Sequence, residues 1–135
     1  MAKLFKLSVV APDRTVFEDE VPSLIAPGVS GYLGVLADHE PSIFALRSGV
    51  VEVMDKNNQR EHIAITGGFL EVSEGQAIIL ADDARLAKDI DVAEEQTLLE
   101  EARKALRGES SRFTHEQAQD ELDRAMARMK AAKRG

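Results

Sequence analysis

Apolar and polar residues alternate in short runs from Phe5 to about Ala84. Phe5, Leu7 and Val9 occupy every second position, and a polar turn at residues 12–14 follows them. Further apolar runs recur about every 8–12 residues, each followed by turn-forming residues, as in an antiparallel sandwich or barrel. These runs cover residues 21–26, 50–54, 62–66, 69–72 and 76–81. The pattern therefore predicts an all-β unit.

The period of the apolar positions changes from two to three or four near Leu86. Asp91 and Glu94 have the spacing of a capping box, which predicts the start of a helix. Gly108 is typical of a residue that ends one. Between them, apolar residues follow at helical spacing: Leu98, Ala102, Ala105 and Leu106. One helix is therefore expected here.

A second helix is predicted after the polar linker at residues 108–112. Thr114 and Gln117 have the spacing of another capping box. A single stripe then runs to about residue 132 at i, i+4, i+8 and i+11, formed by Ala118, Leu122, Met126 and Met129. Because the linker is short, the two helices should be antiparallel neighbours. We expect a β domain at residues 1–86 and a helical hairpin at residues 87–135.

The apolar faces of the predicted hairpin are narrow. They contain alanine where a self-sufficient bundle would contain leucine, so they bury little area at about 25 cal/mol per Å². Isolated helices of fewer than about 15 residues are marginal in water, and slightly longer ones gain little. We therefore expect the hairpin to be held loosely and to be able to move.

Composition excludes several classes of function. The 135 residues are 44% hydrophobic and 30% charged, as in an ordinary globular protein. Cysteine is absent, which excludes disulfides, thiolate metal sites and cysteine nucleophiles. A net charge of −7 argues against general nucleic-acid binding. No run approaches the roughly 20 apolar residues of a membrane span, and the first residues lack the apolar core of a signal peptide. We expect an intracellular protein that does not insert into a membrane.

Charges are segregated along the predicted hairpin. Acids at positions 91, 94, 95, 100 and 101 precede the first cation of the helices. The last twelve residues contain no acid and five bases, which are Arg124, Arg128, Lys130, Lys133 and Arg134. Matching of charges to helix dipoles, at ~0.3–1 kcal/mol each, explains part of this pattern. Arg124 and Arg128 share a face because they are four residues apart. Both a solvated surface and a patch that docks an acidic protein surface or a phosphate fit the pattern.

No catalytic or metal-binding constellation emerges from the sequence. His39, His62 and His115 lie in different elements without ligand spacing, which favours turn or surface roles. Asp82 and Asp83 are adjacent, so their side chains point apart. The segment from Asp82 to Arg85 suits a cap or a salt-bridged exit from the last strand. With no nucleophile and base pair, we expect no catalytic residue, no metal and no enzymatic activity.

Two glycine-rich stretches invite comparison with nucleotide-binding loops. The glycines at 28, 31 and 34 are not followed by Lys-Ser/Thr or by a helix, so neither a P-loop nor a dinucleotide fingerprint is present. Gly67 and Gly68 instead predict a bulge or a close approach of two backbones. The stretch at residues 31–41 predicts a tight connection at the edge of the β fold.

Several short motifs carry a family resemblance. They are Val-Val-Ala-Pro-Asp at 9–13, Gly-Tyr-Leu-Gly-Val-Leu at 31–36 with His39-x-Pro41, Gly-Gly-Phe-Leu-Glu-Val at 67–72, Leu-Ala-Asp at 80–82 and Asp-Ile-Asp at 89–91. In this order and spacing, the chain resembles the epsilon subunit of F-type ATP synthases over essentially its whole length. The resemblance implies a ten-stranded antiparallel β-sandwich followed by an antiparallel two-helix hairpin.

The resemblance also implies a function. Epsilon subunits are non-catalytic parts of the central stalk of the proton-translocating ATP synthase, peripheral at the cytoplasmic face of the bacterial inner membrane. The sandwich contacts the gamma subunit and the c-ring, and the hairpin can extend towards the alpha and beta subunits and inhibit ATP hydrolysis. Expected partner contacts are Gly31, Leu33, His39 and Pro41 on the sandwich, and Arg124, Arg128, Lys130 and Lys133 on the hairpin.

Some bacterial members of this family bind ATP through an Ile/Leu-Asp-x-x-Arg-Ala motif and further arginines. Here Ile90 and Asp91 match, but Glu94 and Glu101 stand at two arginine positions. Each close charge pair with a polyphosphate then costs on the order of 1–4 kcal/mol. Only Asp91, Arg124 and Arg128 remain as weak ATP contacts, so no cofactor is expected. A stand-alone nucleotide sensor or adaptor domain, which is the alternative function, would need the cationic hairpin intact.

Overall fold

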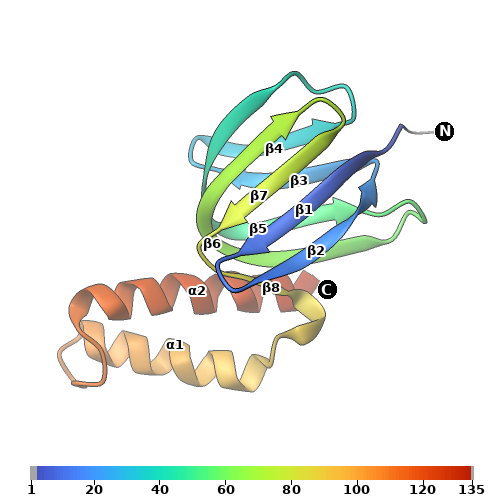
Figure 1. The fold of residues 1–135 in the computed structure, drawn as a ribbon. Helices are drawn as coiled ribbons and strands as arrows, with labels where there is room; N and C mark the ends of the chain where they lie inside the picture. The colour runs from blue at the N-terminus through green and yellow to red at the C-terminus, as the bar shows by residue number, and fades with distance from the viewer. Residues whose placement is uncertain (1–2, 135) are drawn as a thin grey trace.

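The computed structural model describes residues 3–134, which form eight strands and, after them, two long helices (Figure 1). The strands precede the helices along the chain, as the change of period predicted. In chain order the strands are β1 (Phe5–Ala11), β2 (Arg14–Val21), β3 (Ser23–Gly28), β4 (Gly31–Leu36), β5 (Ser42–Met54), β6 (Arg60–Ser73), β7 (Gln76–Ala81) and β8 (Ala84–Leu86). A 3₁₀ turn, η1 (Ala87–Asp89), leads to α1 (Val92–Leu106) and α2 (His115–Arg134).

All eight strands belong to one hydrogen-bonded sheet that folds over a single apolar core. The order is β2-β1-β7-β6-β5-β3-β4, with β8 paired to β6. Strands β1 and β7 are parallel, and the other pairs are antiparallel. The alternation seen in the sequence points every second side chain inwards, so Leu7 and Val9 are fully buried. The sandwich followed by a hairpin is the fold that the sequence predicted.

Two long strands explain why the described residues contain eight strands rather than ten. β5 has 13 residues and β6 has 14, and the two pair along most of their length. β6 pairs with β8 over residues 63–65 and with β7 over residues 68–73, so its halves belong to different parts of the sheet. Between them, Gly67 and Gly68 have φ of 89° and 133°. Each strand therefore bends without a break in the chain and counts once.

Three local sequence interpretations differ from the structure. The run at 21–26 is divided at Pro22, which has no amide hydrogen for the ladder, so that β2 ends and β3 begins there. Residues 31–36, expected as part of a connection, form edge strand β4, and only residues 37–41 form the loop. β5 begins at Ser42, eight residues before the predicted run, because polar residues at 47–48 obscure its alternation.

The predicted helix caps are present. The Asp91 carboxylate accepts a hydrogen bond from the Glu94 amide at 3.2 Å. The Thr114 hydroxyl accepts from the Gln117 amide at 3.1 Å, and the Gln117 side chain accepts from the Thr114 amide at 3.0 Å. The helices are antiparallel, and α2 lies between α1 and the sandwich (Figure 1). The apolar stripe predicted for α2 is wrong at Met126, which is 53% exposed. The side chains of α2 that are buried against the rest of the molecule are mainly alanines.

Candidate functional site

The apolar contact between the hairpin and the sandwich is small and separate from the main core. It is a cluster of four buried residues, which are Val50, Ala64, Ala127 and Ala131. The alanines let α2 approach the strands closely but remove little apolar area from water. The main core contains residues of the strands only. Retention of the hairpin on the sandwich therefore depends strongly on polar contacts.

A buried ion network supplies those polar contacts. Arg128 of α2 is 7% exposed and donates to two carboxylates from different elements. Its Nη2 lies 2.6 Å from Oδ2 of Asp83, between β7 and β8, and its Nη1 lies 3.0 Å from Oε1 of Glu95 in α1. One guanidinium therefore joins the sandwich to both helices. We call Asp83, Arg85, Glu95 and Arg128 the latch.

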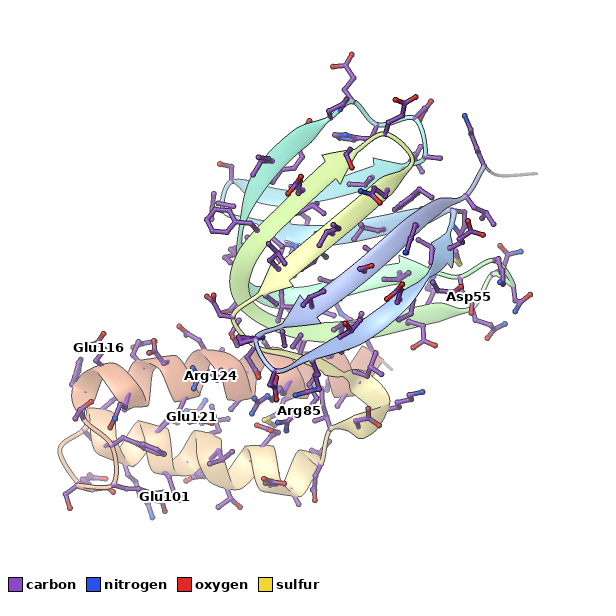
Figure 2. The ribbon with its side chains drawn as sticks, viewed as in Figure 1. Asp55, Arg85, Glu101, Glu116, Glu121 and Arg124 are labelled. Carbon is purple, nitrogen blue, oxygen red and sulfur yellow. The ribbon has the colours of Figure 1, made fainter. Side chains whose placement is uncertain are left out.

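Arg85 of β8 completes the latch. Its Nη1 lies 3.5 Å from Oε1 of Glu95, and Figure 2 shows Arg85 at the junction of the strands and the helices. Burial raises the pKa of Glu95, which is 1% exposed, against the opposing effects of Arg128 and Arg85. Burial lowers the pKa of Arg128, but the hydrogen bond and charge of Asp83, followed by those of Glu95, raise it overall.

The latch is not fully satisfied. The Nε atom of Arg128 is buried and makes no hydrogen bond to the residues described. An unpaired buried donor costs about 1–3 kcal/mol, and desolvation of the four charges of the latch offsets much of their attraction. This balance suits a contact that holds the hairpin in place and can also be released.

Part of the latch was expected from the sequence. The segment from Asp82 to Arg85 was predicted to form a cap or a salt-bridged exit from the last strand, and the ion pairs of Asp83 and Arg85 agree with the second of these. The role of Glu95 was missed. Glu95 precedes Leu99 by four residues and Ala102 by seven, so all three side chains lie on the same, inward face of α1. An acidic residue at the spacing of an apolar stripe could have indicated this buried position. Glu95 was instead grouped with the acids at the start of the helix, next to the capping box of Asp91 and Glu94.

The predicted cationic patch on α2 is not one surface in this conformation. Arg128 is buried in the latch, because the alanine stripe that packs on the sandwich carries it inwards. Arg124 is half-buried, 3.5 Å from Glu121 of the same helix (Figure 2). Only Lys130 and Lys133 are exposed. A patch containing all four cations would require the hairpin to leave the sandwich.

The predicted contact residues of the sandwich lie along β4 and the loop after it. Gly31 and Pro41 are exposed, whereas Leu33 is half-buried and packs against the core. The half-buried His39 ring contacts the edge of Phe44, with the centroids 5.9 Å apart. Its Nδ1 lies 2.8 Å from the Glu40 carbonyl oxygen. These contacts order the loop and leave its polar tip free.

An exposed apolar face on β5, β6 and β7 was not predicted. Phe69 and Leu80 are 56% and 50% exposed and are paired across the sheet, and Ile43 on β5 is 71% exposed. Ala45 pairs with Phe69, which places it in the same row. We call Ile43, Ala45, Phe69 and Leu80 the apolar row. The apolar runs in the sequence predicted strands, but they did not indicate which apolar side chains face outwards.

Other candidate groups are dispersed. His62, expected at a turn or surface, is only 8% exposed because it lies within β6. Within residues 3–134, His, Asp and Glu side chains form no group of three that could hold a metal ion. None of the described helices is long and apolar enough to cross a membrane.

Both parts of the chain match models of a known family. The ATP synthase delta/epsilon chain beta-sandwich domain matches residues 4–87, and the long alpha-helix domain of the same family matches residues 88–133. An ATP synthase epsilon chain from Moorella thermoacetica is 42% identical over 132 residues, which cover 98% of each chain. Another, from Syntrophomonas wolfei, is 35% identical, with 96% of this chain and 95% of the relative covered.

A solved structure supports the same assignment. A chain of the Euglena gracilis mitochondrial ATP synthase is similar with a TM-score of 0.79 at 25% identity, covering 96% of this chain and 81% of that one. The resemblance seen in the sequence motifs is thereby confirmed. The chain belongs to the ATP synthase delta/epsilon chain family.

Proposed function

We propose that the chain is a non-catalytic subunit of the central stalk of a rotary, proton-translocating ATP synthase. The observation that carries this is the match to both family domains over residues 4–133, together with a fold that offers surfaces rather than a reaction centre. The Euglena gracilis assembly is described as containing F1 and a c-ring. The subunit would couple rotation between the c-ring and the catalytic head, and it would lie at the cytoplasmic face of the membrane without entering it.

The sandwich offers two separate contact surfaces for this role. We assign the apolar row to the gamma subunit, because an outward-facing line of large apolar side chains marks a protein interface. The loop at residues 37–41, which follows β4, has a polar tip and suits the polar loops of a c-ring. The continuous sheet between these surfaces makes the sandwich a stiff spacer.

The assembly proposal can be tested by purification. Phe69 and Leu80, both replaced by glutamine, should lower recovery of gamma, alpha and beta with the tagged subunit by about tenfold or more, because buried polar groups without partners oppose association. Ile25 and Val29, replaced in the same way, are the matched control, since both are exposed and lie outside the apolar row. Equal recovery with both double variants, or no recovery of gamma, alpha and beta with the unaltered subunit, would contradict the proposal.

We propose further that the hairpin is a two-state element that regulates ATP hydrolysis. In the retracted state, described here, the latch and the small alanine contact hold α2 on the sandwich. In an extended state, Arg124, Arg128, Lys130 and Lys133 would become one cationic surface for an acidic segment of the catalytic beta subunit. The two states compete for Arg128, so whatever strengthens the latch favours hydrolysis.

Two single substitutions should change hydrolysis by the assembled complex in opposite directions. Arg124→Ala should raise the hydrolysis rate, because it removes a docking cation and leaves the latch intact. Glu95→Gln should lower it, because it weakens the latch and keeps every cation. A change of about twofold or more each way, measured as steady-state turnover at equal complex concentration, is the expected result. Changes of the same sign, or no change with normal assembly, would rule out this mechanism.

Nucleotide has no part in the mechanism that we propose. Arg128, one of the two remaining cations of the family's ATP motif, is already paired with Asp83 and Glu95. Glu94 is exposed beside the start of α1, where it would repel a polyphosphate. Asp83 and Glu95 therefore already neutralise the arginine that a phosphate would need as a partner. The alternative of a stand-alone nucleotide sensor is correspondingly less favoured.

A further inference from the structure

A groove runs along α2, and both the strands and α1 contribute to its walls. Its volume is about 670 Å³, and residues from β4, β5, α1 and α2 line it. Its lining is mainly apolar, and we call the apolar part of the lining, which includes Val92, Leu99, Met126 and Met129, its floor. Such a volume lies within the range of ligand-binding clefts, about 300–1,000 Å³. The groove exists only while the hairpin is retracted, because both parts of the chain contribute to it.

Four cations surround this groove. Arg47, Arg103, Lys130 and Lys133 line it and are exposed. None of them makes an ion pair with any residue between 3 and 134, whereas most other arginines of the chain do. Asp123 is the only acid in the lining. This is notable in a chain with 24 acids and 17 bases.

Large apolar side chains are exposed in the same place. Met126 is 53% exposed, Val92 47% and Tyr32 44%. The Arg47 guanidinium lies over the Tyr32 ring, 5.1 Å from its centroid, which holds this cation at the edge of the groove. Methionine is flexible and polarisable and is common on surfaces that accept peptides of varied sequence. An apolar floor with a free cationic rim is complementary to a ligand that is apolar on one side and acidic on the other.

We propose that this groove binds an acidic amphipathic segment of a partner protein, with apolar side chains on the floor and carboxylates towards Arg47, Arg103, Lys130 and Lys133. Helices with an apolar stripe bind in grooves of this kind. Because the groove needs the retracted hairpin, such a segment would also stabilise that state. This last consequence rests on the proposed regulation, but the binding does not.

The binding can be measured on the full-length isolated chain. The probe is a labelled peptide of about 16 residues with leucine at i, i+3, i+4 and i+7 and glutamate elsewhere, and its anisotropy is followed during titration. Lys130→Glu together with Lys133→Glu should weaken binding by at least about tenfold. Lys88→Glu together with Lys104→Glu makes the same charge change at exposed positions outside the groove and should have little effect. Met126→Gln should weaken binding at unchanged net charge.

Further arms identify the ligand class. In NMR spectra of the unaltered chain, the backbone amides whose chemical shifts change on addition of the peptide should be those around the groove. This measurement needs no variant, so the test remains valid if a variant folds poorly. The same peptide with lysine in place of glutamate should not bind, and added salt should weaken binding of the acidic peptide. If both charge-reversal variants lost binding equally, the peptide would be responding to the net charge of the chain and not to the groove, and the proposal would be overturned. Groove-dependent binding to anionic vesicles without binding to the peptide would assign the site to lipid instead. Either result leaves the assembly test unaffected.

Discussion

Arg128→Ala is expected to release the hairpin from the sandwich while the sandwich stays folded. The substitution leaves Glu95 buried with only Arg85, at 3.5 Å, as a partner. Breaking a buried ion pair by removing one partner costs about 3–5 kcal/mol. The remaining apolar contact is the cluster of one valine and three alanines, with Ala87 and Ile90 packed against it, which is too small to compensate for that loss. Hydrogen exchange should therefore show loss of protection in α2 and unchanged protection in β1, β6 and β7.

Two further variants separate the latch from general effects on α2. Arg124→Ala removes a half-buried side chain whose ion pair is with Glu121 of the same helix, so it breaks no contact of the latch and should change protection less than Arg128→Ala. Arg128→Met combined with Glu95→Leu removes the two most deeply buried charges and keeps a similar volume. Only Asp83, which is partly exposed, then lacks its partner, so much of the protection should return. Unchanged exchange in the Arg128→Ala variant, or no recovery in the double variant, would show that the latch does not hold the hairpin.

The sequence predicted the fold because each local signal agreed with the global one. Alternation in β1, the change of period before α1, and the two capping boxes were all read correctly. The strand boundaries were predicted wrongly where the residue types within a strand or run depart from simple alternation. Pro22 interrupts an apolar run, and β5 crosses polar positions at 47–48 as it bends. Period alone cannot indicate such bends, because they depend on pairing with strands distant in sequence.

The functional features were less accessible to sequence analysis. Asp83 and Arg85 were expected to form salt bridges, but their partners were unknown, because Glu95 and Arg128 are brought together only by the packing of α1 on α2. The cationic segregation in the hairpin was recognised as a surface patch. In the structure it divides between a buried cation and exposed ones. Charge pattern indicates where charges lie along a helix, whereas burial depends on which face packs.

Gly68→Ala is expected to destabilise the whole sandwich by on the order of 4 kcal/mol, since a strained backbone costs about 1–3 kcal/mol and overpacking a similar amount. Gly68 has φ of 133°, a conformation that residues with a Cβ rarely adopt. A Cβ there would overlap the Leu80 carbonyl oxygen and lie 2.8 Å from the Ala81 Cα, and both are backbone atoms of the neighbouring strand. This close approach is what the glycine pair at 67–68 predicted.

Gly75→Ala is the matched control for that prediction. Gly75 also has positive φ, 74°, but a Cβ there would meet no atom within 4 Å, so only the conformational cost of about 1–2 kcal/mol remains. Urea denaturation of both variants, with the free energy of unfolding extrapolated to water, measures the difference. The steric overlap at Gly68 should make its loss at least about twice that at Gly75. Equal losses would mean that β6 and β7 can separate at the bend, and the sheet would then be too compliant to serve as a stiff spacer.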